Sequence, residues 1–396
     1  MIPLELDLLE PLGRQIARPW ADAVTGLQID SRRISEGDLF VAVGGGGDFV
    51  EHALARGAAA ALVPTDAHAA LASVGGTVRD RSNARVVAIT GSTGKTSTKD
   101  ILYAMCAPQA KTIANEGNYN NELGVPLTLA RLEPDTEICI TELGMRGLGQ
   151  IAYLASFTKP DIGVITNVGP VHLELVETVE NVAKAKAELL AALPPGGVAV
   201  IPDEPLLEPH LDRADIIVER VDLDERLPFV TSYSAKHQLA NTRFALAAAR
   251  HLGIALPAGE LHVEFSKLRE EERELPGGGL LLNDCYNANP VSMRAALEHL
   301  SERAHGRRRI AVLGEMAELG DGAPAYHEEI GALVRELGIE HVIAVGGLAR
   351  AYGGEWVADA AGAAERLRGA LHPGDVVLVK GSRSVGLEVV AENLER

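Results

Sequence analysis

The residues best suited to chemistry lie in a glycine-rich stretch that follows a short apolar run. Residues 85–90, Arg-Val-Val-Ala-Ile-Thr, are typical of a buried strand, and the pattern Gly-Ser-Thr-Gly-Lys-Thr-Ser comes next. The backbone N–H groups of such a turn can bind phosphate oxygens, aided by the positive end of a following helix. The spacing therefore predicts a nucleotide-phosphate site formed by Gly91, Ser92, Thr93, Gly94, Lys95, Thr96 and Ser97.

Parts of this stretch have separate chemical roles. The two glycines permit unusual backbone conformations and a close approach of phosphate, while Lys95 supplies a cation and Thr96 a hydroxyl for Mg²⁺. The full phosphate-loop pattern has a further glycine where this chain has Ile89. An ordinary strand-to-helix turn is therefore the alternative, but the strand before and the helix after favour phosphate binding.

Short apolar runs alternate with helix-like stretches on both sides of this loop, which is typical of parallel sheets covered by helices. The strand candidates beyond the first domain are 137–141, 162–166, 197–201, 280–283, 309–313, 341–345 and 375–379. We expect an α/β fold of three domains. These are a small N-terminal α/β domain (1–84), a central doubly wound, mostly parallel sheet (85–258) and a C-terminal Rossmann-like domain (259–396). Glycines 44–47 predict a flexible loop in the first domain.

Bulk properties exclude several classes of protein. A chain of 396 residues is too long for one core, and a net charge of −18 argues against nucleic acid as a partner. No apolar run reaches the roughly 20 residues that span a bilayer, and the acidic start of the chain is unlike a signal peptide. The three cysteines show no metal or redox spacing, which fits a reduced compartment. We expect a cytoplasmic protein, and a monomer.

Further motifs make the sequence recognisable. In the central part they are Glu-Gly-Asn-Tyr-Asn-Asn-Glu-Leu-Gly-Val-Pro (116–126), Glu-Leu-Gly-Met (142–145), Ile-Thr-Asn-Val-Gly-Pro-Val-His-Leu-Glu (165–174) and Ala-Lys-Ala-Lys-Ala-Glu (183–188). In the last third they are Asn-Asp-Cys-Tyr-Asn-Ala-Asn-Pro (283–290), Leu-Gly-Glu-Met-Ala-Glu-Leu-Gly (313–320) with His327, and Lys-Gly-Ser-Arg (380–383). In this order, over nearly the whole chain, they resemble the Mur ligase family.

The resemblance implies an ATP-dependent, ADP-forming ligase of peptidoglycan precursor synthesis. Such a ligase converts a carboxylate into an acyl phosphate and joins it to an amine. The Tyr-Asn-Ala-Asn-Pro and Leu-Gly-Glu-Met-x-Glu-Leu-Gly stretches favour the members that add D-alanyl-D-alanine to UDP-N-acetylmuramoyl-tripeptide. These two small molecules are therefore the expected substrates beside ATP and Mg²⁺.

The resemblance also implies a metal site and a set of catalytic residues. The metal ligands are expected to be Thr96, Glu142, His172 and Lys186, the last after carbamylation by CO₂, which would turn a cation into an anionic ligand. Oxygen ligands with one imidazole are chemically reasonable for Mg²⁺. The implied catalytic residues are Lys95, Glu142, His172, Lys186 and Arg269. Without the resemblance, His172 and Lys186 read as solvated surface residues.

Binding residues are implied in all three domains. Nucleotide contacts are expected at His237, Asn241, Arg269, Asp284, Tyr286, Asn287 and Asn289. Substrate contacts are expected at Ser31, Arg32, Asn118, Asn120, Asn121, Asn167, Lys380, Ser382 and Arg383. Two alternatives stay open: an asparagine-rich turn stabilised by its own side chains around 118–121, and a solvated loop at 380–383.

The chain departs from the family pattern at several positions. Gln238 replaces an asparagine, Leu268 replaces the glycine before the arginine, and the segment between Val200 and His237 is short. In the first domain, the usual Asp-Gly-His loop is reduced to the glycine-rich residues 44–49. We therefore expect altered recognition of the UDP group.

Two rival functions stay open. One is a related Mur-type or folylpolyglutamate-type ligase with another amino acid or carboxylate, against which the Tyr-Asn-Ala-Asn-Pro stretch argues. The other is a nucleotide-binding relative that has lost catalysis. The presence of Lys95, Glu142, His172 and Lys186 argues against that second function.

Overall fold

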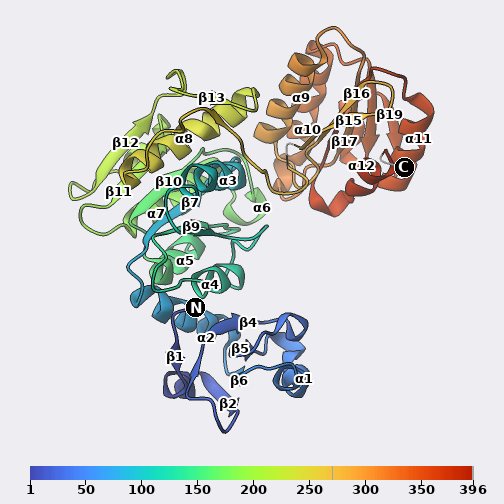
Figure 1. Ribbon diagram of the computed structural model, residues 1–396. Coiled ribbons are helices and arrows are strands. Elements are labelled where there is room, and N and C mark those ends of the chain that lie inside the picture. Colours follow the sequence, from blue (N-terminus) through green and yellow to red (C-terminus); the bar gives the residue numbers. More distant parts are fainter. Residues whose placement is uncertain (270, 395–396) are drawn as a thin grey trace.

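Three sheets of four or six strands follow one another along the chain (Figure 1). The structure is a computed structural model that describes residues 1–269 and 271–394. Figure 1 shows the N-terminal unit at one end, the central unit next to it, and the C-terminal unit beyond a connecting segment. The predicted fold class, α/β with a central phosphate-loop sheet, is confirmed.

The N-terminal sheet has the strand order β2-β6-β5-β4. Its strands are Gly13–Ala17 (β2), Ala60–Pro64 (β6), Asp38–Val41 (β5) and Gly26–Gln28 (β4), and its helices are Val50–Ala55 (α1) and Ala67–Asp80 (α2). A smaller pair joins Leu4–Glu5 (β1) to Ala23–Val24 (β3). Asp66 caps α2 by accepting the Ala69 N–H at 3.0 Å. The buried face of α2 belongs to one core with the next domain, so the two domains form a continuous apolar unit.

The central sheet is wholly parallel, with order β12-β11-β10-β7-β9-β8. Its strands are Ile217–Val221, Val198–Pro202, Ile162–Ile165, Arg85–Thr90, Ile138–Glu142 and Thr112–Ala114 in that order. Its helices are Lys95–Cys106 (α3), Gly124–Leu129 (α4), Gln150–Thr158 (α5), Leu173–Val176 (α6), Val179–Ala191 (α7) and Lys236–Leu252 (α8). Strand side chains alternate between faces. Val87 and Ile89 therefore join the core with α3 and α8, whereas Val86 and Ala88 join the opposite one.

The segment after α8 stays attached to the central sheet unit. Val230–Thr231 (β13) pairs with Glu260–Leu261 (β14), and the Ser266 N–H donates to Asp100 Oδ2 at 2.8 Å. The sequence places the domain boundary at 258. Because contacts with the central unit continue to Ser266, we propose that the C-terminal domain starts after that residue.

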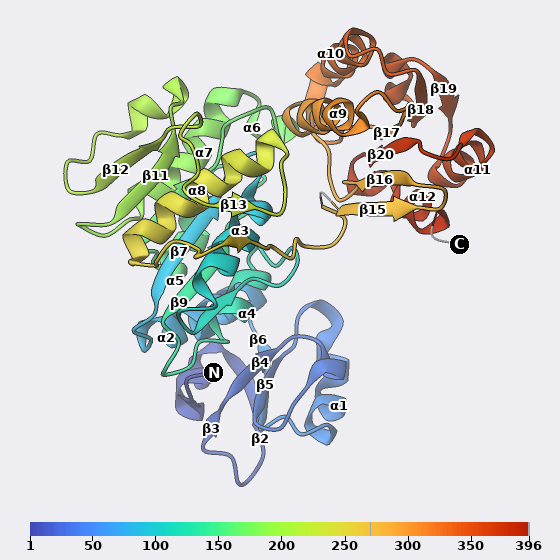
Figure 2. The ribbon, with the colours of Figure 1, turned by 45° about the horizontal axis from the view of Figure 1, so that its top comes forward.

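The C-terminal sheet has order β15-β16-β20-β17-β18-β19, and only the β15–β16 pair is antiparallel. The strands are Glu271–Leu275, Gly279–Asn283, Val376–Lys380, Arg309–Gly314, His341–Val345 and Glu355–Val357 in that order. The helices are Pro290–Ala304 (α9), Ala323–Glu336 (α10), Ala360–Ala370 (α11) and Glu388–Asn393 (α12). Helices α9 and α10 share one core with one face of the sheet, and α11 and α12 share another with the other face. Figure 2 shows these helices on both sides of the sheet.

The predicted strands agree with the observed ones to within two residues. Residues 85–90 and 341–345 coincide with β7 and β18. The glycine-rich loop predicted at 44–47 contains a short 3-10 helix, Gly44–Phe49, whose turns are closed by local backbone bonds such as Gly46 N–H to Val43 O at 2.9 Å. Within the described ranges, no helix is both long and apolar enough to cross a bilayer.

A partly exposed ion-pair cluster joins the edge strand β15 to α9. Burial alone would raise the pKa of Glu272, but hydrogen bonds from His299 and Arg303 lower it to about 2. A carboxyl group whose pKa is depressed by folding stabilises the fold above its unfolded pKa, and this contribution is lost as the pH falls. The cluster should therefore lose its effect between pH 4.5 and about 2.

We expect Glu272→Gln to lower the free energy of local opening at β15 and α9 by about 1 kcal/mol at pH 7, allowing for solvent screening. Near pH 2 the substitution should have almost no effect on this free energy. Hydrogen–deuterium exchange of β15 and α9 measures the local opening. Glu274→Gln is the control, since Glu274 lies exposed on the same strand. Equal protection of the wild type and Glu272→Gln at pH 7 would contradict the prediction.

Candidate active site

The predicted phosphate loop lies between β7 and α3, and neighbouring loops hold its backbone. Asn167 Oδ1 accepts the N–H groups of Ser92 and Thr93, each at 2.9 Å, while Thr166 Oγ1 donates to Thr93 O at 2.5 Å. The Lys95 ammonium donates to Gly91 O at 2.7 Å. Asn167 thus stabilises the backbone of the phosphate loop in this structure. The sequence predicts it to be a substrate contact.

Gly94 has a conformation that side chains rarely adopt. Its φ is +76°, and an added Cβ would lie 2.3 Å from Asn241 Oδ1. Asn241, predicted to contact the nucleotide, is buried on α8 directly against this glycine. Gly94 also immediately precedes α3, whose first N–H groups would face a bound phosphate.

Gly94→Ala is therefore expected to reduce nucleotide affinity about tenfold or more, because strain of about 1–3 kcal/mol falls on the loop. Titration calorimetry with ADP measures the affinity. Gly147→Ala is the matched control, since Gly147 has open space around its Cβ position and no left-handed φ. Unchanged ADP affinity in Gly94→Ala would refute the role of this backbone position.

Glu142 is the buried acidic group of the site, 1% exposed at the carboxyl end of β9. Its Oε2 accepts the Thr96 hydroxyl and its Oε1 accepts the Asn120 amide, both at 2.7 Å. Burial alone would raise the pKa of Glu142, but Lys95 and Arg269 lower it on balance. The carboxylate therefore stays ionised beside the phosphate loop.

Lys186 lies on the inward face of α7 and is 1% exposed. Burial, with a smaller contribution from nearby Lys95, lowers its pKa well below the ordinary lysine range. Within residues 1–269 and 271–394, no acceptor forms a hydrogen bond or ion pair with its amine. The adjacent lysine in the sequence motif, Lys184, is exposed.

His172 follows β10 and immediately precedes α6. Its pKa is lowered, chiefly by burial, and Lys95 and Lys186 contribute in the same direction against the effect of Glu318. The charges of Lys95 and Lys186 therefore act on the His172 ring. The Nδ1 atom of His172 lies 2.5 Å from Oε2 of Glu318.

Two predicted nucleotide residues reach the site from the C-terminal side. Asn289 caps α9, with Ser292 completing a capping box, and its Nδ2 lies 3.4 Å from Ser92 O. The guanidinium of Arg269 stacks on the Tyr286 ring, 4.1 Å from its centre. Arg269 also affects the pKa values of Lys95 and Glu142, which places its charge near the phosphate loop.

Leu268 explains one departure from the family pattern. Its φ is +61°, a left-handed value that glycine adopts readily and leucine does not. The backbone here therefore has the conformation that the family's usual glycine suits. The other departure, Gln238, lies buried on α8, next to His237. His237 itself makes an edge-to-face contact with His299 of α9, with 5.8 Å between ring centres.

Several predicted contact residues are engaged within the C-terminal domain. Lys380, 1% exposed, pairs with Asp284 Oδ2 at 2.5 Å and donates to Asn287 O at 3.1 Å. Ser382 is buried, and its Oγ accepts the Ala317 N–H at 2.8 Å. Of the 380–383 cluster, Arg383 is the exposed member and lies 3.5 Å from Glu388.

The N-terminal residues and the asparagine-rich turn divide into different roles. Ser31 is buried with its Oγ 3.0 Å from His52 Nδ1, while the Arg32 side chain is 83% exposed and paired with Asp30. In the turn, Asn121 Oδ1 accepts the Gly124 N–H at 3.0 Å at the start of α4, which is the stabilising role left open above. Asn118 lies exposed.

Sequence reasoning missed a buried asparagine that positions Glu142. Asn115 is 3% exposed, and its Oδ1 accepts the backbone N–H of Glu142 at 2.5 Å. It immediately precedes the asparagine-rich motif, so its place in the chain was the available signal. Glu318 was quoted within a motif but given no role, because nothing local showed that its partner is in another domain.

The donor set fits Mg²⁺. Thr96 and Glu142 offer hard oxygen atoms to one point beside the phosphate loop. No three His, Cys, Asp or Glu side chains gather as a metal cluster in the part of the chain described. A cation there would need oxygen atoms from phosphates and water, as Mg²⁺ does in nucleotide sites.

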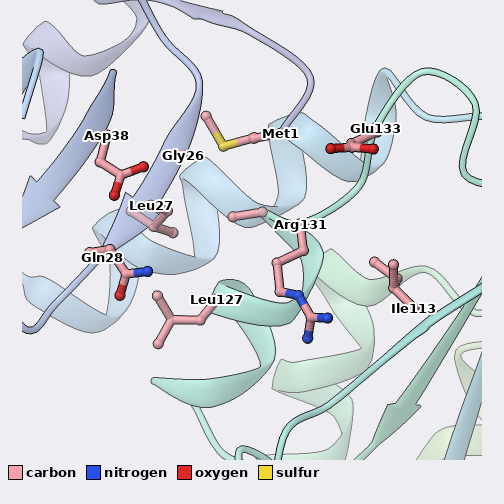
Figure 3. A pocket seen from close by; sticks show the side chains of 10 residues that line it. Met1, Gly26, Leu27, Gln28, Asp38, Ile113, Leu127, Arg131 and Glu133 are labelled. Atoms are coloured by element: carbon pink, nitrogen blue, oxygen red, sulfur yellow. The ribbon is translucent and has the colours of Figure 1, made fainter. Parts of the chain in front are cut away.

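A separate cleft of about 360 Å³ opens between the first two domains (Figure 3). Gln28 and Asp38 lie on the N-terminal side, and Arg131 and Glu133 lie on the central side. None of the predicted site residues is among those that line it. The cleft is thus distinct from the phosphate loop.

The fold and site define a multidomain P-loop nucleotide-binding protein. Residues 89–246 match the Mur ligase middle domain, and residues 269–383 match the glutamate ligase domain of Mur ligases. Together these matches cover well over half of the chain. The chain belongs to the Mur ligase family, which confirms the resemblance seen in its motifs.

Individual relatives agree over nearly the full length. UDP-N-acetylmuramoyl-tripeptide–D-alanyl-D-alanine ligase of Synechocystis is 34% identical, with 94% of this chain and 92% of the relative covered. The Escherichia coli K12 ligase of the same name is 32% identical, with 94% of each covered. MurF from Acinetobacter baumannii superposes with a TM-score of 0.86 at 26% identity, covering 100% of this chain and 99% of that one.

Two further structures bear on nucleotide binding and on the rival function. MurF ligase from Thermotoga maritima, solved in complex with ADP, has a TM-score of 0.82 at 27% identity over 94% of this chain and 97% of that one. Folylpolyglutamate synthase from Mycobacterium tuberculosis has a TM-score of 0.61 at 16% identity, covering 82% of this chain and 94% of that one. The latter shares the fold alone.

Proposed function

We propose that this chain is an ATP-dependent ligase that adds D-alanyl-D-alanine to UDP-N-acetylmuramoyl-tripeptide. The observation that carries the proposal is the likeness, over 94% of the chain, to curated ligases with that activity in their names. The intact phosphate loop, with ionised Glu142 beside Thr96, supports the same chemistry.

The first step transfers a phosphoryl group. The backbone N–H groups of the phosphate loop and the start of α3 hold the phosphates, and Lys95 and Arg269 supply positive charge. An oxygen of the tripeptide's terminal carboxylate forms a bond to the γ-phosphorus while the bond to the β–γ bridging oxygen breaks. The products are an acyl phosphate and ADP.

The second step forms the amide. The amine nitrogen of D-alanyl-D-alanine bonds to the acyl carbon, the bond from that carbon to the phosphate oxygen breaks, and the amine loses a proton. Inorganic phosphate leaves. Asn289 and the Arg269–Tyr286 pair belong to the C-terminal side of the site, so approach of that domain encloses the reacting groups and excludes water.

Thr96, Glu142 and His172 would hold Mg²⁺, with Lys186 as a further ligand once carbamylated. The ion supplies charge neutralisation for the transferring phosphoryl group. Asn120 and Asn115 keep Glu142 oriented toward the loop. The amine of Lys186 is buried and has no acceptor among the described residues, which supports carbamylation, because an uncharged amine is the form that reacts with CO₂.

We further propose that the protein works as a monomer in the cytoplasm. One chain supplies every residue of the proposed site. All three cysteines are buried free thiols, which fits a reducing compartment.

Phosphate release from ATP by the purified protein tests the function. UDP-N-acetylmuramoyl-tripeptide is present throughout, and the amines are varied one at a time. Release that depends on D-alanyl-D-alanine, with the matching UDP-pentapeptide seen by mass spectrometry, supports the proposal. Release with a different amine, or none with any, refutes it.

A further inference from the structure

A loop of the C-terminal domain reaches across to the central domain through one carboxylate. Glu318 Oε2 lies 2.5 Å from His172 Nδ1, and Glu318 Oε1 lies 3.6 Å from Arg146 Nε. Arg146 follows β9 and His172 follows β10. These are the strands whose ends carry Glu142 and the phosphate-loop brace Asn167. One side chain therefore bridges both sides of the proposed metal site.

Both loops that meet at this contact have unusual backbones. Six non-glycine residues of the described chain have a positive φ, and His172 (+54°) and Glu318 (+62°) are two of them. Gly320, at φ +61°, lies so close to α6 that an added Cβ would be 3.4 Å from the Glu174 N atom. Such conformations cost on the order of 1 kcal/mol each and persist where surrounding contacts hold them.

Other residues of the C-terminal domain hold the loop that carries Glu318. The N–H of Met316 donates to His327 Nε2 at 3.0 Å, so the proton of neutral His327 is on Nδ1, which donates to Ala323 O at 2.7 Å. Ser382 Oγ accepts the N–H of Ala317. Glu318 is thus presented from a fixed loop and moves with its domain.

We propose that Glu318 is a positioning residue for His172, an inference that rests on the metal role proposed for that histidine. A carboxylate at Nδ1 accepts the Nδ1–H and leaves the Nε2 lone pair for a cation. Because the two residues belong to different domains, their contact links cation binding to closure of the C-terminal domain. Linkage is reciprocal, so a bound cation favours the closed arrangement.

Binding of Mn²⁺ tests this role without ligase turnover. The full-length protein with a non-hydrolysable ATP analogue is titrated with Mn²⁺, and free Mn²⁺ is measured by electron paramagnetic resonance. Glu318→Ala should lower Mn²⁺ affinity about tenfold or more, with Glu318→Gln between it and the wild type. Asp321→Asn is the control: it removes the same charge from an exposed neighbour that makes no hydrogen bond or ion pair in the described structure.

Two further measurements separate positioning from general damage. Glu318→Ala should have no additional effect in a His172→Ala background, and small-angle scattering should show less compaction by Mn²⁺ and analogue in Glu318→Ala than in the wild type. If Glu318→Ala binds Mn²⁺ as tightly as the wild type does, the positioning role of Glu318 is wrong, while the metal role of His172 still stands. A wild-type complex that binds no Mn²⁺ overturns the metal role of His172, and this proposal with it.

Discussion

Lys186→Ala is expected to lower phosphate release by roughly 10³-fold or more, since loss of a metal ligand removes several kcal/mol of transition-state stabilisation. The amine is buried, lowered in pKa and without an acceptor in the described structure. Such an amine can attack CO₂: the nitrogen–carbon bond forms as one carbon–oxygen π bond of CO₂ breaks, the nitrogen loses a proton, and the neutral amine becomes an anionic carbamate. Added bicarbonate should not restore the alanine variant, because no amine remains.

Two companion variants keep this prediction open to refutation. Lys186→Met retains the side-chain volume but removes the amine. If this variant folds well and is inactive, the loss of activity comes from the missing amine and not from a packing defect. Lys184→Ala changes an exposed lysine of the same helix and should keep full activity. Carbon-13 NMR after incubation with labelled bicarbonate should show a carbamate signal in the wild type and Lys184→Ala alone. Substantial turnover by both Lys186 variants would contradict the proposed role of Lys186 as a carbamylated metal ligand.

Glu142→Gln is expected to reduce turnover by about 10²- to 10³-fold while the fold is retained. The carboxylate accepts from Thr96 and Asn120 at once, and a glutamine can accept with only one of its two terminal atoms. Loss of the charge also removes the strongest proposed attraction for Mg²⁺. The Mg²⁺ concentration needed for half-maximal phosphate release should therefore rise together with the loss of rate.

Glu137→Gln provides the matched control for this substitution. Glu137 is exposed, immediately precedes β9, and accepts the Lys111 N–H at 3.0 Å. Its replacement should leave both the rate and the Mg²⁺ requirement unchanged. The melting temperature of Glu142→Gln should fall below that of the wild type, because the lowered pKa of Glu142 means that its charge stabilises the fold and its loss leaves Lys95 uncompensated. An unchanged Mg²⁺ requirement in Glu142→Gln would count against the proposed metal site.

Local patterns were sufficient to predict the most apolar strands and the glycine-rich turn after β7. A buried parallel strand needs an unbroken apolar run, as in residues 85–90, and the loop needs glycine at positions such as Gly94. Both requirements act over a few neighbouring residues, so they can be read from one segment. At 44–47 the sequence predicts only a flexible loop, because glycine permits many conformations, and local backbone bonds give these residues a 3-10 helix.

Motif matching assigned residues to a site without stating their individual contacts. Lys380 is predicted to contact a substrate, and in the structure its ammonium is buried against Asp284. Asn121 carries the same prediction, and in the structure its side chain stabilises the start of α4. The chemical type of a side chain is encoded locally, but the partner that takes its charge or hydrogen bond depends on chain segments that only folding brings near.

The sequence by itself therefore predicted the family, the α/β fold class and the glycine-rich turn between β7 and α3, because each is recorded in short runs of neighbouring residues. Tertiary structure alone decided that Asn115 orients Glu142, that α2 joins the cores of two domains, and that Glu318 meets His172. The last pair is separated by 146 positions. Contacts of this kind depend on the packing of whole domains, which no local pattern of residues records.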